Sequence, residues 1–298
     1  MTLTSAFKTP QGEAAYLAAY DAAMELWPVP YQEIEVPGRF GITHVVASGP
    51  EDAPPLVLLH GFMTNATMWV PSVADFARDY QVYAIDVLGQ PGKSVPNPDQ
   101  PIRDAADYVA WLGETLDGLD LDRISLVGMS YGGWLALSFC LAAPERVGKL
   151  VLLSPAASLQ PIVKQMGLRV MLMVLLPTHL TVNLLFGWMG FKGTPGDTVV
   201  RCVLDQAYLG LQHFRMPPES SQIMPSVFSD NDLRALHVPV LLLIGENEVI
   251  YDAAKALDRA RALLPNLEGE LVPQSSHEMC SSQYQTVDER VLDFLSDN

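Results

Sequence analysis

Five short runs of consecutive apolar residues divide the chain, at residues 56–59, 82–85, 124–127, 150–153 and 240–244. Between such runs, residues 105–119 and 134–143 carry apolar side chains at helical spacing. Uninterrupted apolar strands are typical of a parallel sheet that is buried on both faces. The alternation of strand and helix therefore predicts an α/β fold, with a mostly parallel central sheet flanked by helices and right-handed crossovers.

The two ends of the chain extend this pattern. Residues 14–27 have the apolar spacing of an amphipathic helix, which Pro28 and Pro30 end. Residues 31–36 and 42–47 predict an antiparallel hairpin at the edge of the sheet. Near the carboxyl terminus, residues 268–272 predict a last strand, and a terminal helix is expected from about Thr286.

The pattern breaks in the middle of the chain. Residues 156–234 contain helical apolar material rich in Met and Leu but no convincing strand. We therefore expect an inserted helical lid, or cap, over residues 156–234, and a core formed by residues 1–155 and 235–298. Residues 170–191 lack any charged side chain, as a membrane span would, but Pro177 and Thr178 interrupt them. Two short helices joined by a turn fit this break better than stable membrane insertion does.

Composition excludes several classes of protein. The chain has 298 residues, of which 49% are hydrophobic, and a formal net charge of -16. A length and apolar content of this kind indicate a folded domain with a sizeable core, and the acidic balance makes nucleic acid an improbable partner. Cys140, Cys202 and Cys280 show no metal-binding or disulfide spacing. With no basic and apolar leader at the amino terminus, we expect a cytoplasmic protein. A monomer or a homodimer is expected.

A candidate nucleophile stands between a predicted strand and a predicted helix. Gly128-Met129-Ser130-Tyr131-Gly132 forms a G-x-S-x-G pentapeptide in that position. Such a serine occupies a sharp, strained turn, where a Cβ on either flanking glycine would collide with the neighbouring strand and helix. Ser130 is therefore expected at the carboxyl edge of the sheet, beside the amino end of a helix whose free N–H groups suit an oxyanion. The Tyr131 amide is one expected donor.

The segment that supplies the second oxyanion donor follows residues 56–59. It reads His60-Gly61-Phe62-Met63. Gly61 lets the chain turn back toward the nucleophile, so that the Phe62 amide donates to the oxyanion. Phe62 and Met63, with Met129, are expected to contact substrate. His60 is expected to orient this loop through hydrogen bonds rather than to carry a proton.

In this order the motifs resemble those of the α/β-hydrolase superfamily, in particular its serine carboxylesterases and lipases. The motifs are HGF at His60, DVLGQPGKS from Asp86, GMSYGG from Gly128, PERVGKLVLLSP from Pro144, GENE from Gly245 and a late histidine. The resemblance covers about residues 31–295 and implies the α/β-hydrolase fold, with an inserted helical lid as its variable part. It also implies the catalytic order serine, acid, histidine.

That order assigns the remaining catalytic residues. His277, just after the last predicted strand, is the expected general base and acid. The superfamily usually has Gly before this histidine, whereas Ser276 stands here, which implies a loop of different shape. Glu248 occupies the usual position of the acid, and glutamate is an accepted variant. Asp252 is the rival acid, although its place before a helical stretch also suits an N-cap.

These residues predict a carboxylesterase that cleaves uncharged esters with short to medium acyl chains through an acyl-enzyme on Ser130. No metal-binding spacing or dinucleotide motif is present, so no cofactor and no metal are expected. The apolar lid favours a small-molecule ester as the partner. His179 and His213 are candidates to line the pocket from the lid. The alternatives are another acyl hydrolase of the same fold, such as a C–C bond hydrolase, lactonase or lipase, and a slow-turnover hydrolase-fold receptor.

Overall fold

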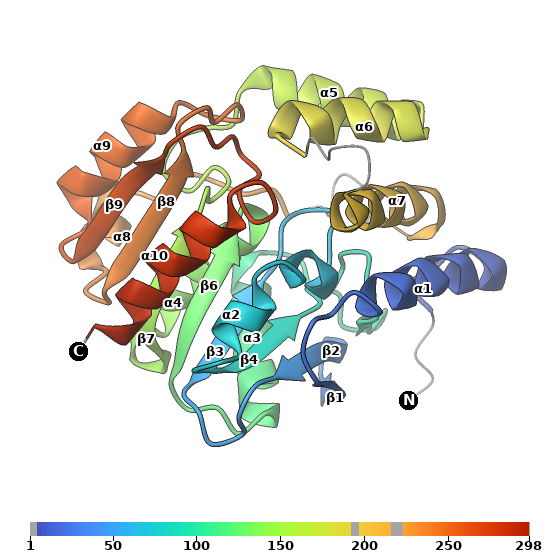
Figure 1. The fold of residues 1–298 in the computed structure, drawn as a ribbon, viewed down its shortest axis with the longest axis horizontal. Helices are drawn as coiled ribbons and strands as arrows, with labels where there is room; N and C mark the ends of the chain where they lie inside the picture. The colour runs from blue at the N-terminus through green and yellow to red at the C-terminus, as the bar shows by residue number, and fades with distance from the viewer. Residues whose placement is uncertain (1–4, 192–196, 216–222, 298) are drawn as a thin grey trace.

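The computed structural model describes residues 5–191, 197–215 and 223–297, and within them one nine-stranded sheet forms the centre of the molecule (Figure 1). The strand order is β1-β2-β4-β3-β6-β7-β8-β9, with the short β5 paired to β2. The strands are β1 Tyr31–Gly38, β2 Gly41–Ser48, β3 Pro55–Leu59, β4 Gln81–Ile85, β5 Val95–Pro96, β6 Ile124–Met129, β7 Val147–Leu153, β8 Val240–Gly245 and β9 Leu267–Val272.

The sheet is antiparallel at one edge and parallel elsewhere. β1 and β2 form the predicted hairpin, and β2 also runs antiparallel to β4. From β4 through β9, every neighbouring pair is parallel. All five apolar runs lie in this parallel part, which confirms the predicted architecture. The carboxyl ends of β3, β6, β8 and β9 therefore lie on one edge of the sheet, where ligands of α/β proteins usually bind.

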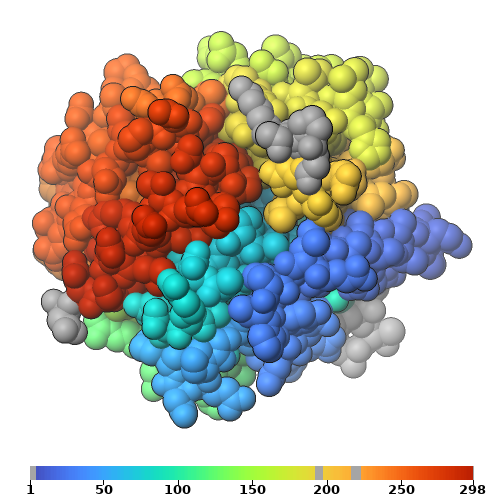
Figure 2. All heavy atoms as spheres, in the orientation of Figure 1, coloured from blue at the N-terminus to red at the C-terminus, as the bar shows by residue number. Residues whose placement is uncertain are grey.

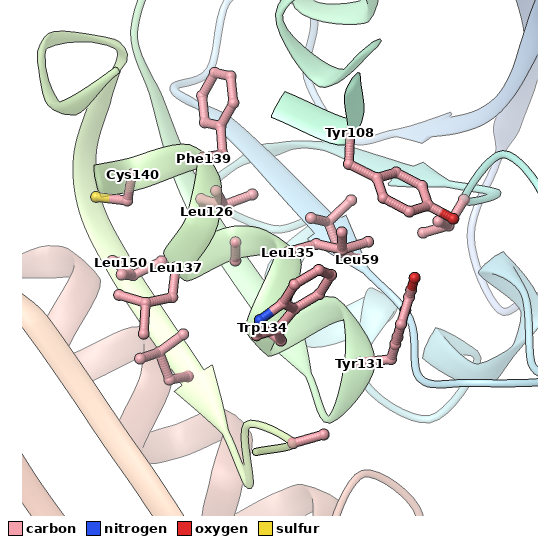
Figure 3. Packing of buried hydrophobic residues seen from close by; sticks show 14 of the residues in the cluster. Leu59, Tyr108, Leu126, Tyr131, Trp134, Leu135, Leu137, Phe139, Cys140 and Leu150 are labelled. Atoms are coloured by element: carbon pink, nitrogen blue, oxygen red, sulfur yellow. The ribbon is translucent and has the colours of Figure 1, made fainter. Parts of the chain in front are cut away.

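Helices cover both faces of the sheet. Successive residues of each central strand point to opposite faces, and since these residues are apolar, both faces are buried under helices. In β3, Val57 and Leu59 join one apolar cluster, whereas Leu56 and Leu58 join the other. The first cluster includes residues of α3, α4 and α9, and the second includes residues of α1, α2 and α10. Figure 3 shows part of the first cluster, in which α4 packs over β6 and β7.

The helices are α1 Pro10–Met24, α2 Val73–Phe76, α3 Ala105–Gly118, α4 Tyr131–Ala142, α5 Lys164–Leu175, α6 His179–Met189, α7 Thr198–His213, α8 Asp230–Ala235, α9 Ala253–Leu263 and α10 Tyr284–Ser296. Helix α1 begins and ends earlier than the apolar spacing predicts. Thr9 accepts a hydrogen bond from the Gly12 amide at 3.0 Å, and Pro10 follows as the first helical residue. This N-cap fixes the start of α1 four residues before the predicted one.

Between β7 and β8 the chain forms the expected helices, with no strand among its described residues. Helices α5 and α6 are separate because the chain turns at residues 176–178, where Thr178 caps α6 in a capping box with Thr181. No helix in the described ranges is long and apolar enough to cross a membrane. In Figure 2, α5 and α6 lie at the surface beside the C-terminal part of the chain.

The outer side of α5 and α6 exposes an unusual number of large apolar side chains. We call this surface the apolar hairpin face; it consists of Leu168, Met171, Leu172, Val174, Leu175, Leu176, Leu180 and Leu184. Their exposure contrasts with Met173 on the same helix, which is buried against the core. Large contiguous apolar patches are uncommon on the surface of soluble monomers.

Candidate active site

Ser130 lies between β6 and α4 in a strained backbone conformation. Its φ of 52° and ψ of -110° are rare for a residue other than glycine. The surrounding backbone holds this conformation, because the Ser130 amide donates to the Leu153 carbonyl at 2.9 Å and its own carbonyl accepts from Ala156 at 2.9 Å. The hydroxyl is thereby presented at the carboxyl edge of the sheet, as the motif predicts.

The flanking glycines make this turn possible. A Cβ on Gly128 would lie 2.3 Å from the Gly132 carbonyl oxygen, and a Cβ on Gly132 would lie 2.2 Å from the Leu59 carbonyl oxygen. Both distances are far shorter than a van der Waals contact, and the atoms involved are backbone atoms, which cannot move aside as a flexible side chain can. The predicted collision with helix and strand is therefore confirmed at both positions.

Ser130, His277 and Glu248 form a continuous chain of hydrogen bonds. Nε2 of His277 lies 2.8 Å from the Ser130 hydroxyl oxygen, and Nδ1 of His277 lies 2.7 Å from Oε2 of Glu248. The side chains of His277 and Glu248 are almost fully buried, with exposed fractions of 3% and 0%. The structure thus brings together three side chains that lie up to 147 residues apart in the sequence.

The carboxylate of Glu248 is held in its ionised form. Burial raises the pKa of Glu248, but the His277 charge and the hydrogen bonds to His277 and to backbone outweigh it, so the pKa is lowered. Oε1 accepts from the amides of Val249 and Ile250 at 2.7 and 2.9 Å. These two bonds leave Oε2 free to face the imidazole.

The rival acid lies away from the histidine. Asp252 caps α9 by accepting from the Lys255 amide at 3.0 Å, and it forms an ion pair with the Lys255 ammonium at 2.8 Å. Its expected role as an N-cap is confirmed. Of the two candidates, only Glu248 is positioned to accept the imidazole N–H.

His60 fixes the loop that carries Phe62. The Val87 amide donates to Nε2 of His60 at 2.9 Å, so Nδ1 carries the proton, which it donates to the Gly61 carbonyl at 2.8 Å. His60 is fully buried, and burial lowers its pKa despite the nearby Asp86, which favours this neutral form. The expected orienting role of His60 is therefore confirmed.

The two amides expected to bind an oxyanion are uncommitted. Within the described residues, neither the Phe62 amide nor the Tyr131 amide donates to a protein acceptor, whereas the amides on either side of Phe62 do. Gly61 donates to the sulfur of Met68 at 3.3 Å, and Met63 donates to Oε1 of Gln90 at 3.1 Å. A loop held in this way leaves the Phe62 N–H available to an external acceptor.

Two hollows meet at Ser130. The larger is a cleft of about 1220 Å³, which Phe62, Tyr131 and Ser130 border together with residues of α5 and of residues 223–227. The smaller is a recess of about 40 Å³, which Ser130 shares with His277, Met63 and Met129 and which α6 closes. The two methionines therefore border the recess and not the cleft.

The histidines of α6 and α7 that were expected to line the pocket border neither hollow. His179 is exposed and stacks on Tyr208 with ring centroids 3.7 Å apart, and His213 packs against Gly12. The prediction that either histidine lines the pocket is wrong. The His179 ring lies at the surface against α7, and the His213 ring packs against α1.

Residues that the sequence did not assign to the site also contribute to it. Gln90 holds the loop that carries Phe62, by accepting from the Met63 amide, and Ser5 and Ala6 reach the cleft from the amino terminus. Ser276, which replaces the usual glycine, donates its hydroxyl to the Asn247 carbonyl at 3.2 Å and so links the histidine loop to the acid loop. The motif of residues 86–94 marks the region of Gln90, but its side-chain contact depends on tertiary structure.

The α6 helix is attached to the histidine loop. The amide of Glu278, the residue after His277, donates to the Met189 carbonyl at the end of α6 at 2.9 Å. Gly190 follows with a φ of 111°, and a Cβ there would lie 2.9 Å from the Cβ of Ser276. Glycine is therefore required for α6 to approach this loop so closely.

Comparison with known proteins places the chain among hydrolases. A family model described as "Alpha/beta hydrolase family" matches residues 56–291. The chain is 36% identical to the "Uncharacterized carboxylesterase nap" of Bacillus subtilis over 94% of this chain and 92% of that protein. It is 33% identical to "Carboxylesterase YbfK" of the same organism, over 97% and 96%.

Solved structures agree with these matches. The crystal structure of naproxen esterase from Bacillus subtilis superposes with a TM-score of 0.89 at 34% identity, covering 97% of this chain and all of that one. The carboxylesterase CesB (YbfK) structure gives a TM-score of 0.87 at 32% identity, over 96% and 99%. Likeness therefore extends over the central sheet and the helices between β7 and β8 alike.

Proposed function

Because the chain belongs to the alpha/beta hydrolase family, we propose that it is a carboxylesterase in which Ser130, His277 and Glu248 form the catalytic triad. The observation that carries this proposal is the pair of hydrogen bonds that joins the three side chains beside an open apolar cleft. The relatives named as carboxylesterases, which match nearly the full chain, support the same activity.

The reaction begins when the Ser130 hydroxyl attacks the ester carbonyl carbon and passes its proton to Nε2 of His277. Glu248 stabilises the imidazolium that forms. The Phe62 and Tyr131 amides donate to the tetrahedral oxyanion, and the start of α4 adds its partial positive charge. The C–O bond then breaks, and the leaving alcohol takes the proton from Nε2. Water, deprotonated by His277, hydrolyses the acyl-enzyme and restores Ser130.

The two hollows divide the ester between them. A general acid must lie within hydrogen-bond reach of the leaving oxygen, and His277 borders the recess but not the cleft. The alcohol part therefore faces the recess beside Met63 and Met129, and the acyl part occupies the cleft. In this proposal residues 156–234 act as a lid, since α5 borders the cleft and α6 closes the recess.

The test is hydrolysis of methyl esters from acetate through decanoate, followed by the acid released at constant pH. The wild type is expected to cleave esters of short to medium acyl chains, and Ser130→Ala is expected to lower kcat by roughly 10⁴-fold or more. Circular dichroism of the variant checks that it is folded. A wild-type protein that binds these esters without hydrolysing them overturns the proposal and favours a receptor role.

A further inference from the structure

The large cleft carries a charge opposite to that of the whole chain. The protein has 34 acidic and 18 basic residues. Yet the charged residues among the described lining of the cleft are Arg103, Lys164 and Arg215, and no acidic side chain joins them. A random sample of this surface would be mainly acidic, so the cationic lining is a local feature of the cleft.

Three distant segments supply these cations. Arg103 lies just before α3, Lys164 is the first residue of α5, and Arg215 follows α7. Arg103 belongs to the core, Lys164 and Arg215 belong to the segment between β7 and β8, and all three are exposed. The fold thus places three separate positive charges on the lining of one cleft.

Within the described part of the chain, these cations lack carboxylate partners. The side chains of Arg103 and Lys164 make no hydrogen bond or ion pair there, and Arg215 uses only Nε, which donates to the Phe7 carbonyl at 2.9 Å. By contrast, Arg146 and Arg290 elsewhere on the surface are paired with carboxylates. The cationic groups of the cleft therefore retain donors for a ligand.

The acidic residues next to Arg103 are engaged with backbone. Asp104 caps α3 by accepting from the Asp107 amide at 2.9 Å, and Asp107 accepts from the Arg103 amide at 2.9 Å. Neither borders the cleft. The remaining wall is largely apolar, with Leu88, Ile162 and Val170 among its residues, and apolar walls reduce the screening of charges at the opening.

We propose that the acyl part of the preferred substrate carries a carboxylate, which the cationic residues of the cleft lining, Arg103 foremost, bind while the ester group lies at Ser130. The substrate class is then the half-esters of dicarboxylic acids, with an apolar chain between the two ends. Arginine and lysine bind carboxylates through charge-assisted hydrogen bonds. This inference rests on the proposed esterase function and assigns the substrate class of that same site.

The experiment compares each monomethyl ester of the C4 to C10 dicarboxylic acids with the methyl ester of the monocarboxylic acid of equal length. Initial rates are followed by acid release at neutral pH, at about 0.01 M and about 0.5 M salt. At low salt, kcat/KM for the best half-ester is expected to exceed that of its uncharged partner by about tenfold, mainly through KM. High salt is expected to reduce this ratio.

Two variants separate the cleft cations from charge in general. Arg103→Gln is expected to lower the half-ester preference by about threefold, because an exposed ion pair makes only a modest contribution to binding. Arg169→Gln is the matched control, since Arg169 lies on α5 over the Trp188 ring and does not border the cleft. The control variant is expected to keep the wild-type kcat/KM for the half-ester and for the uncharged ester.

The outcomes are distinct. A wild-type enzyme that cleaves uncharged esters at least as well as half-esters at low salt overturns the inference but leaves the esterase function intact. An equal loss of preference in Arg169→Gln and Arg103→Gln also overturns it, because the effect then follows net charge. A protein that cleaves neither ester class contradicts the proposed function itself.

Discussion

Oε2 of Glu248 lies 2.7 Å from Nδ1 of His277, while Oε1 of the same carboxylate accepts two backbone amides. Both oxygens are thus engaged, and the imidazole is fixed with Nε2 toward Ser130. Glu248→Gln is expected to lower kcat by about 10³- to 10⁴-fold, because the amide neither selects the correct tautomer nor stabilises the imidazolium. Steady-state kinetics on a methyl ester measure this loss.

Asp252→Asn is the matched control for that variant. The exposed Asp252 caps α9 and pairs with Lys255, so the substitution is expected to cost about 1 kcal/mol of stability or less and to leave kcat unchanged. Equal losses of kcat in both variants, or near wild-type kcat in Glu248→Gln, would contradict the assignment of the acid.

The second prediction concerns the oxyanion loop. His60→Phe removes the acceptor for the Val87 amide and the donor to the Gly61 carbonyl, both of which are buried. The Phe62 amide then loses its fixed direction, and kcat is expected to fall by about 10²-fold with a smaller change in KM. Thermal unfolding identifies a variant that has simply lost its fold. A folded variant with unchanged kcat would show that the loop is held without His60.

The third prediction is a dependence of stability on pH through Asp288. Burial raises the pKa of this carboxyl to about 8 from 3.8; a Ser72 hydrogen bond offsets only part of this effect, and repulsion from Asp75 raises the pKa slightly further. Its Oδ2 has no hydrogen-bond partner among the described residues, and Cys280 lies nearby. Since the unfolded carboxyl ionises first, stability is fully present below the unfolded pKa and is lost as pH rises to about 8.

Asp288→Asn removes this titration. Relative to the wild type, its free energy of unfolding is expected to rise by about 2 kcal/mol or more between about pH 5 and about pH 9. Urea unfolding at both pH values measures the difference. Asp293→Asn, an exposed substitution on the same helix, serves as the control, and parallel pH curves for wild type and Asp288→Asn would refute the prediction.

The fourth prediction concerns the apolar hairpin face. Leu175 and Leu180 are 69% and 68% exposed, so Leu175→Gln with Leu180→Gln is expected to change stability by only about 0.5 kcal/mol. Solubility should rise and the binding of an apolar dye should fall. Met173→Gln on the same helix is expected to cost about 2–5 kcal/mol, because Met173 is 1% exposed. A large loss of stability in the leucine variant would indicate that these leucines are covered in solution.

The sequence predicts the sheet well because its strands follow from local rules, and the turn at Ser130 follows from the same kind of rule. Apolar runs at residues 56–59 and 124–127 have few alternatives to buried parallel strands, and Gly128 and Gly132 mark the turn at Ser130. Glu248 after β8 and His277 after β9 were expected from the order of residues that the resemblance to α/β-hydrolases implies, and the structure brings both side chains to Ser130.

Other features depend on contacts between segments that no local pattern records. Gln206 of α7 lies beside Asn65 and Thr67 in the core, and its side chain accepts from both. Similarly, the cations Arg103 and Lys164 border one cleft only because the helical insertion folds back over the sheet. Residue type alone cannot predict such pairings, because the chain has many other polar side chains that could form the same contacts.

The hydrogen bond from the Glu278 amide to the Met189 carbonyl joins α6 directly to the residue after His277. If α6 moves away from the core to enlarge the recess, this bond breaks and the backbone beside His277 loses an anchor. A widely open molecule would then be a poor proton-transfer catalyst, and the resting serine would be less reactive toward stray electrophiles. An enlarged recess and an anchored His277 backbone would therefore exclude one another.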